Sequence, residues 1–214
     1  MVAVNRSLSD GTIAPAELNA LSARDYLQNA ALSASQLTEA CLQQISAREE
    51  QVQAWSFVDS QHALAQAETL DHYRQSGRPL GALHGIPIGI KDIIDTQDMP
   101  TENGCALDAG RRPEEDAWLV ARLRAAGAVI LGKTVTTECA YLAPGKTRNP
   151  QNPEHTPQRL GRPPQQLIAD REGIQVFIAE IHFAQSADRH RQRAGYLGRG
   201  QLLDRPVAIV GYHL

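Results

Sequence analysis

The most regular pattern in the chain is an alternation of apolar positions within residues 84–96. Isoleucine stands at 86, 88 and 90, which is the period-2 spacing of a strand. Two glycines and a proline interrupt this run, and glycine in a strand usually marks a bulge or a close approach of another backbone or a ligand. We therefore predict an irregular strand that leads to Lys91.

Residues 15–76 have the spacing of helices, with one short interruption. Ser22, and then Ser33 or Ser35, precede periodic apolar segments, where N-caps are expected. Residues 55–58 are consistent with a strand between two helices. The apolar positions recur at helical spacing as Leu37, Cys41, Leu42 and Ile45, and then as Ala63, Leu64, Ala67, Leu70 and Tyr73.

A loop rich in turn-forming residues, 96–113, separates the strand from the next predicted helix. That helix is expected to have an acidic first turn at residues 114–116, which suits the helix dipole. Residues 128–132 then form a fully apolar run, typical of a strand buried in a parallel sheet. Helix, glycine and apolar strand in quick succession predict an α/β fold. The predicted apolar face of the helix consists of Trp118, Leu119, Ala121, Leu123 and Ala125.

Composition and charge narrow the function classes. The 214 residues are 42% hydrophobic and 21% charged, which permits a sizeable core. The net charge of −3 does not indicate binding to nucleic acid. No apolar run has the length of a membrane span, and the N-terminus does not have the pattern of a secretion signal. Cys41, Cys105 and Cys139 lack metal-ligand spacing and are interpreted as free thiols of a reducing cytoplasm. We expect a cytoplasmic protein without a metal or a cofactor.

Lys91 is one of three lysines in the chain, with Lys133 and Lys146. A lysine at the end of an apolar strand is a candidate for desolvation, which lowers its pKa and frees the amine to act as a base. The alternative is a surface lysine loosely paired with Asp92. The local sequence alone favours this alternative, because solvated lysines far outnumber perturbed ones.

Several motifs in a fixed order change this balance. The segment 83–92, Leu-His-Gly-Ile-Pro-Ile-Gly-Ile-Lys-Asp, resembles the lysine motif of the amidase signature family. Residues 123–134 resemble the helix-to-strand signature of that family, and further matching segments follow up to Pro157. The resemblance runs from about Leu18 to Pro157, roughly the first third of a usual family member.

The resemblance implies an N-terminal part of the amidase-signature fold, a mixed sheet flanked by helices. It implies a triad of a nucleophilic serine, a bridging serine with a cis peptide bond and a lysine, which together cleave the carbon–nitrogen bond of a small-molecule amide through an acyl-enzyme. Lys91 matches the position of the catalytic lysine. Lys133 matches no catalytic role and is interpreted as structural, and His84 as a packing or hydrogen-bonding residue; His155 is interpreted as a loop residue.

The family pattern stops after Pro157. A Gly- and Ser-rich segment carrying the bridging serine should follow, but no serine occurs from Gln158 until Ser186. Residues 158–214 contain eight arginines and five acids, so this segment has a net charge of +3. We therefore predict two parts, residues 1–157 from an amidase domain and a tail 158–214 of unknown structure. The chain is expected to be a truncated and inactive fragment.

Two other functions stay open. A non-catalytic relative would use the helical residues 15–76 and the strand that leads to Lys91 as a binding or interaction module. An amidotransferase A-subunit-like protein would instead deliver ammonia from an amide. An incomplete core would also expose apolar sheet surface, through which the chain is expected to form oligomers or aggregate. A monodisperse, cooperatively melting protein would favour the module, and insoluble material the fragment.

The tail is expected to come from a shifted reading frame. Residues 158–161, Gln-Arg-Leu-Gly, can be encoded by CAG-CGG-CTC-GGC, and the same bases read one position later give Ser-Gly-Ser. Sequencing the gene beyond codon 157 should reveal a Gly/Ser-rich amidase segment in another frame. The absence of such a segment from all frames would refute the frameshift.

Overall fold

The computed structural model describes residues 14–141, 144–150 and 152–154. All of them belong to one structural unit, residues 1–180. The boundary predicted at Pro157, the tail with Ser186, and His155 lie outside the described residues.

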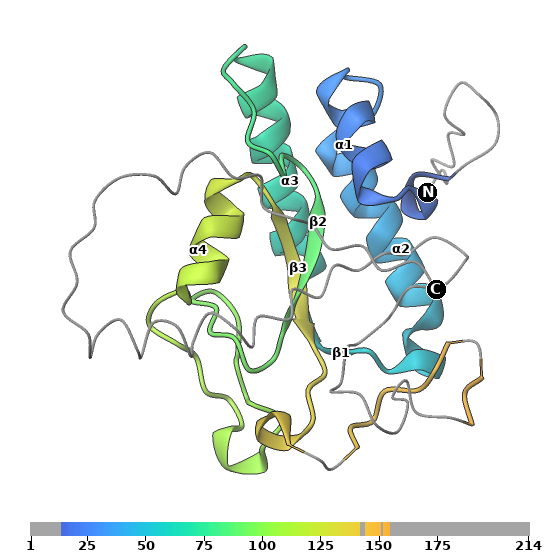
Figure 1. The fold of residues 1–214 in the computed structure, drawn as a ribbon, viewed down its shortest axis with the longest axis vertical. Coiled ribbons are helices and arrows are strands. Elements are labelled where there is room, and N and C mark those ends of the chain that lie inside the picture. Colours follow the sequence, from blue (N-terminus) through green and yellow to red (C-terminus); the bar gives the residue numbers. More distant parts are fainter. Residues whose placement is uncertain (1–13, 142–143, 151, 155–214) are drawn as a thin grey trace, which may run out of the picture. The chain divides into compact units, whose positions relative to one another are not determined.

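Three strands form a mixed sheet in the order β1-β3-β2. The strands are β1 (Trp55–Val58), β2 (Pro87–Lys91) and β3 (Val129–Thr134). β2 runs parallel to β3, and β1 runs antiparallel to it. The predicted neighbourhood of the Lys91 strand and the apolar strand is therefore confirmed, as is the α/β fold class with helices flanking a mixed sheet (Figure 1).

Helices lie on both sides of these strands. Figure 1 shows α1 (Ala20–Gln28) and α2 (Ala34–Val52) on one side and α4 (Trp118–Ala125) on the other. The fourth helix, α3 (Ser60–Gln75), packs against α2 and β3. The short 3-10 turns are η1 (Pro15–Glu17), η2 (Ala106–Asp108) and η3 (Glu138–Ala140).

Of the predicted N-caps, Ser33 is confirmed and Ser22 is wrong. The Ser33 hydroxyl accepts a hydrogen bond from Gln36 N at 3.0 Å, and the Gln36 side chain accepts one from Ser33 N, which forms a capping box at the start of α2. The preceding helix begins two residues earlier than Ser22, because Asn19 Oδ1 accepts from Ser22 N at 2.9 Å. Asparagine caps as well as serine does, so the serine alone did not decide the start.

The predictions for α4 were wrong in two respects. The acidic residues 114–116 precede the helix, and Asp116 instead accepts hydrogen bonds from Arg124 Nε and Gln97 N, both at 2.9 Å. The buried residue of this helix is Val120, whereas Trp118 is 70% exposed with the Arg122 guanidinium over its ring. A helix of eight residues has too few turns for spacing to identify its buried face.

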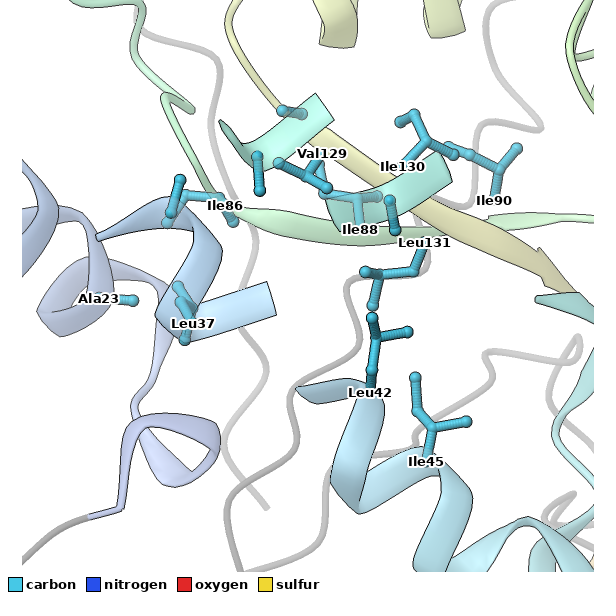
Figure 2. Packing of buried hydrophobic residues seen from close by; sticks show 14 of the residues in the cluster. Ala23, Leu37, Leu42, Ile45, Ile86, Ile88, Ile90, Val129, Ile130 and Leu131 are labelled. Carbon is cyan, nitrogen blue, oxygen red and sulfur yellow. The ribbon is translucent and has the colours of Figure 1, made fainter. Parts of the chain in front are cut away.

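The core lies between α2, α3 and the strands. Figure 2 shows Leu42 and Ile45 of α2 pointing toward the strands, where all three isoleucines of the alternating run are buried. Ala63 and Ala67 of α3 are fully buried. The predicted stripes of α2 and α3 are confirmed in these members, while Tyr73 is exposed.

The pairing of β2 is irregular, as predicted, although the extra residue lies in β3. The pairing of β2 with β3 shifts between Ile88 and Gly89, so that β3 contains one extra residue, Leu131. The Gln66 side-chain amide donates to Ile130 O and accepts from Ile130 N, both at 3.1 Å, and so satisfies the backbone of β3 beside this bulge. Beyond it, a Cβ at Gly132 would lie 2.1 Å from the carbonyl oxygen of Phe57, so β1 approaches β3 too closely for any side chain.

We predict that Gly132→Ala lowers the free energy of unfolding by about 3 kcal/mol, because the added methyl must push β1 away from β3. The matched control is Gly77→Ala, which has a positive φ of 70° but open space around the Cβ position. Its cost is expected to be about 1 kcal/mol. Urea unfolding followed by circular dichroism measures both, and equal losses would contradict this account of Gly132.

Candidate active site at the end of the parallel strands

Lys91 is the last residue of β2 and is almost completely buried, with 6% of its surface exposed. It pairs with Thr134 of β3, and Ile90 pairs with Lys133. Because neighbouring residues of a strand point to opposite faces, Lys91 and Lys133 lie at the same edge of the sheet but on opposite faces. The strand pairing thus separates the two lysines.

Asp92 does not serve as the partner of Lys91. Its buried carboxylate accepts from Glu102 N at 3.2 Å and lies 3.8 Å from Lys133 Nζ. Within the described residues, Lys91 Nζ takes part in no hydrogen bond or ion pair. The alternative of a surface lysine loosely paired with Asp92 is therefore wrong, because Lys91 is buried and the Asp92 carboxylate lies against Glu102 N and Lys133 Nζ instead.

Lys133 occupies a polar pocket inside the protein and has no exposed surface. Its Nζ donates to Ile94 O at 2.6 Å and to Thr96 Oγ1 at 3.1 Å, and Thr101 Oγ1 is the third acceptor. Burial lowers the pKa of Lys133 to about 8, and the negative charge of Asp92 opposes this shift. These contacts support the structural interpretation of Lys133.

The pKa of the buried Asp92 carboxyl is shifted in the opposite direction to that of Lys133. Burial raises the pKa of Asp92, while the hydrogen bond from Glu102 N and the charge of Lys133 act in the opposite direction. Asp92 and Lys133 therefore form a buried pair of opposite charges, each of which stabilises the ionised form of the other.

Backbone hydrogen bonds connect this pair to Lys91. Ile94 N donates to Lys91 O, and Asp92 N donates to Thr134 O, both at 2.9 Å. Asn103 N donates to Asp92 O at 2.9 Å. The chain after β2 is therefore folded back against the strand ends rather than extended away from them.

The sequence indicated a structural role for Lys133 but did not identify Thr96 and Thr101 as its acceptors. One signal was present: a lysine inside an otherwise apolar strand must find acceptors if the strand is buried. Nothing local to Lys133 shows that these acceptors come from residues more than thirty positions earlier in the chain.

His84 lies before β2, away from the strand end with Lys91. It is buried, its ring centroid lies 6.2 Å from that of Tyr73, and its Cα is where a Cβ of Gly127 would collide. Burial and then the charge of Arg74 lower the pKa of His84. The prediction of a packing histidine is confirmed.

The three cysteines are free thiols, as predicted. Among the described residues, no group of His, Cys, Asp and Glu side chains has the arrangement of a metal site. None of the helices in this part of the chain combines the length and the apolar character needed to cross a bilayer.

Comparison with solved structures shows that this architecture is similar to that of known amidases. The peptide amidase from Stenotrophomonas maltophilia superimposes with a TM-score of 0.62 and 36% identity, covering 66% of this chain and 31% of that structure. Fatty acid amide hydrolase, at 23% identity and a TM-score of 0.60, shares the fold. The described residues thus form part of an α/β domain of the amidase-signature class.

The sequence comparisons show the family. The family model described as Amidase matches residues 36–157, more than half of the 214 residues. The chain belongs to the amidase family, which confirms the resemblance found in the sequence.

The A subunit of glutamyl-tRNA(Gln) amidotransferase from Salinispora arenicola is 42% identical over 135 residues, covering 60% of this chain and 28% of the relative. Putative amidase AmiD of Mycobacterium tuberculosis is 41% identical over 140 residues, covering 65% and 29%. The chain therefore spans less than a third of the length of these curated relatives.

The buried charge of Lys133 should make stability depend on pH. Its pKa is about 8 in the folded chain and 10.5 as the ordinary value, so the unfolded chain binds more protons between these two values. The free energy of unfolding should therefore rise with pH from about 8 to 10.5, by up to about 3 kcal/mol relative to Lys133→Met. Below pH 8 the cost of burying the charge is fully present.

Urea unfolding at several pH values measures this difference. Lys146→Met is the matched control, since Lys146 is exposed, and it should follow the wild type at every pH. A wild type and a Lys133→Met variant that keep a constant difference in stability from pH 7 to 10.5 would contradict the assignment.

Proposed function

We propose that this chain carries the lysine-bearing part of an amide hydrolase site, in which Lys91 is the general base. The observation that supports this most directly is the position of Lys91: it is buried at the end of a parallel strand, and its Nζ is unpaired within the described residues. A base must be shielded from water and must keep its nitrogen free for the reacting hydroxyl. Membership of the amidase family supplies the class of reaction.

Lys133 meets only one of these two requirements. Burial lowers its pKa, but its Nζ already has three oxygen acceptors and no exposed surface. A hydroxyl group of a nucleophile would have to displace Ile94 O or a threonine to reach it. Lys91 is therefore the better candidate for proton transfer.

In the proposed reaction the neutral amine of Lys91 takes the proton of a bridging serine, which takes the proton of the nucleophilic serine. The nucleophilic oxygen attacks the amide carbonyl, the carbon–nitrogen bond breaks, and the leaving nitrogen takes up the proton and departs as ammonia or an amine. Water then hydrolyses the acyl ester. The split into two steps is the general advantage of covalent catalysis.

We further propose that these 214 residues do not hydrolyse amides by themselves. The segment that follows Pro157 contains no serine before Ser186, so the sequence does not provide the Gly/Ser-rich loop that the family mechanism requires. A lysine without a nucleophile has no hydroxyl to activate. We also propose that the substrate is a small amide. The protein would act in the cytoplasm, associate with other copies of itself and need no nucleic acid, metal or cofactor.

A second candidate is the glutamine-hydrolysing reaction of an amidotransferase, with ammonia as the product that is passed on. The 42% identity to the Salinispora arenicola amidotransferase favours it. Both candidates use the same carbon–nitrogen cleavage, so Lys91 would have the same role in either. The choice of glutamine or another amide as the preferred substrate separates them.

The inactivity is tested by incubating the purified chain with glutamine and a panel of aliphatic and aromatic amides. We expect no release of ammonia above that of buffer. Turnover that disappears in Lys91→Ala would show that the chain is active and that the proposal of inactivity is wrong.

The role of Lys91 is tested in a chimera, in which residues 1–157 are followed by the C-terminal part of the Mycobacterium tuberculosis AmiD. If this chimera hydrolyses an amide, Lys91→Ala should reduce kcat by about 10⁶, the loss typical of removing one member of a catalytic unit. Lys146→Ala is the control and should retain full activity. Near-normal turnover of a folded Lys91→Ala chimera would show that another group is the base.

A further inference from the structure

We propose that Lys133 is a positioning residue that holds the segment 92–101 in place and thereby fixes the end of β2, where Lys91 lies. This inference rests on the proposed role of Lys91 as the base. Lys133 would act on Lys91 through this segment and would not contact the substrate.

The first support is the way Lys133 connects separate parts of one loop. Its three acceptors belong to Ile94, Thr96 and Thr101, which span eight residues of the chain. An ammonium group has three N–H donors, and here each donor has an oxygen. Because the two threonines and the lysine are fully buried, water does not compete for these hydrogen bonds.

The second support is the short connection from this pocket to Lys91. Ile94 contributes its carbonyl to Lys133 Nζ and its N–H to Lys91 O at 2.9 Å. Asp92, the residue next to Lys91, lies 3.8 Å from Lys133 Nζ and donates its backbone N–H to Thr134 O. A shift of this segment would therefore move the last residue of β2.

Asp92 is the carboxylate that forms an ion pair with Lys133, because the other nearby carboxylates are paired with other side chains. Arg111 binds Asp95 in a bidentate pair at 2.8 and 3.0 Å. Asp98 is held by Arg124 Nη2 at 2.7 Å and by His62 Nε2 at 2.6 Å. These two carboxylates attract Lys133 at longer range, and Arg111 repels it. Removing the Lys133 charge would leave the buried Asp92 without an ion-pair partner among the described residues.

The chain is well suited to a direct test, since it contains only three lysines. A chain labelled with ¹³C and ¹⁵N in lysine gives three side-chain signals by NMR, which Lys91→Arg and Lys146→Arg assign. Hydrogen exchange of the backbone amides in residues 92–101 supplies a second readout. Neither measurement requires catalytic activity.

Two variants remove the hydrogen bonds between Lys133 and the segment 92–101 in different ways. Lys133→Met replaces the ammonium with an apolar group of similar length, and Thr96→Val/Thr101→Val removes two acceptors while every charge stays in place. Both should shift and broaden the side-chain signal of Lys91 and accelerate amide exchange in residues 92–101 by at least about tenfold. The signal of the exposed Lys146 should not move.

A variant with an unrelated defect separates positioning from stability. Leu27→Ala creates a cavity in α1 and lowers stability without touching the loop. It should leave the Lys91 signal unchanged. An unchanged Lys91 signal and unchanged exchange in the folded double valine variant would overturn the proposal, even if Lys133→Met does not fold.

The activity of the chimera tests the role of Lys91 as base, and the NMR signals of the original chain test the positioning role of Lys133. If Lys91→Ala leaves the AmiD chimera active, the role of Lys91 as base fails, whatever the NMR signals of the original chain show. If Lys91 is the base and Lys133 positions it, Lys133→Met and the double valine variant should lower kcat of the chimera by about 10² with little change in KM. A loss confined to KM would contradict positioning of the base.

Discussion

The parallel pairing of β2 with β3 is the constraint on which the rest of this structure depends. It brings the ends of two strands that are separated by about forty residues to one edge, and the two-residue alternation of strands sends Lys91 and Lys133 to opposite faces. The ladder is interrupted at the Leu131 bulge, and the side chain of Gln66 bonds the backbone N–H and carbonyl of Ile130 beside it. Two lysines with different surroundings therefore result from one pairing register.

A buried ammonium imposes the second constraint, since its charge must be met by oxygen atoms. The loop after β2 supplies a carbonyl, two hydroxyls and the Asp92 carboxylate to Lys133. The same loop is fastened at its outer side by Arg111 and Arg124. A segment without long regular elements is thus ordered by polar contacts that converge from β3, α3 and α4.

Amide cleavage needs a base that is shielded from water and a nucleophile that it can reach. The described residues contain a buried lysine at the end of a parallel strand, inside the segment that the Amidase family model matches. The chain corresponds to less than a third of its curated relatives, and its residues after Pro157 do not resemble the Gly/Ser-rich loop of the family. The proposed inactivity follows from this difference, because the proposed base would have no serine of such a loop to activate.

The sequence by itself determined the features that depend on near neighbours. Alternating isoleucines indicated β2, and the glycines and proline among them indicated its irregular pairing. Ser33 indicated the start of α2, and the motif at 83–92 indicated the family and placed Lys91 at the end of a strand. Tertiary structure decided the rest. Trp118 was expected in the core and is exposed, because the buried side of a short helix depends on what packs against it. Lys133 acquired its lowered pKa, and Asp92 its partner, from contacts with residues far away in the chain, because desolvation depends on the whole enclosure of a group and not on its neighbours in sequence.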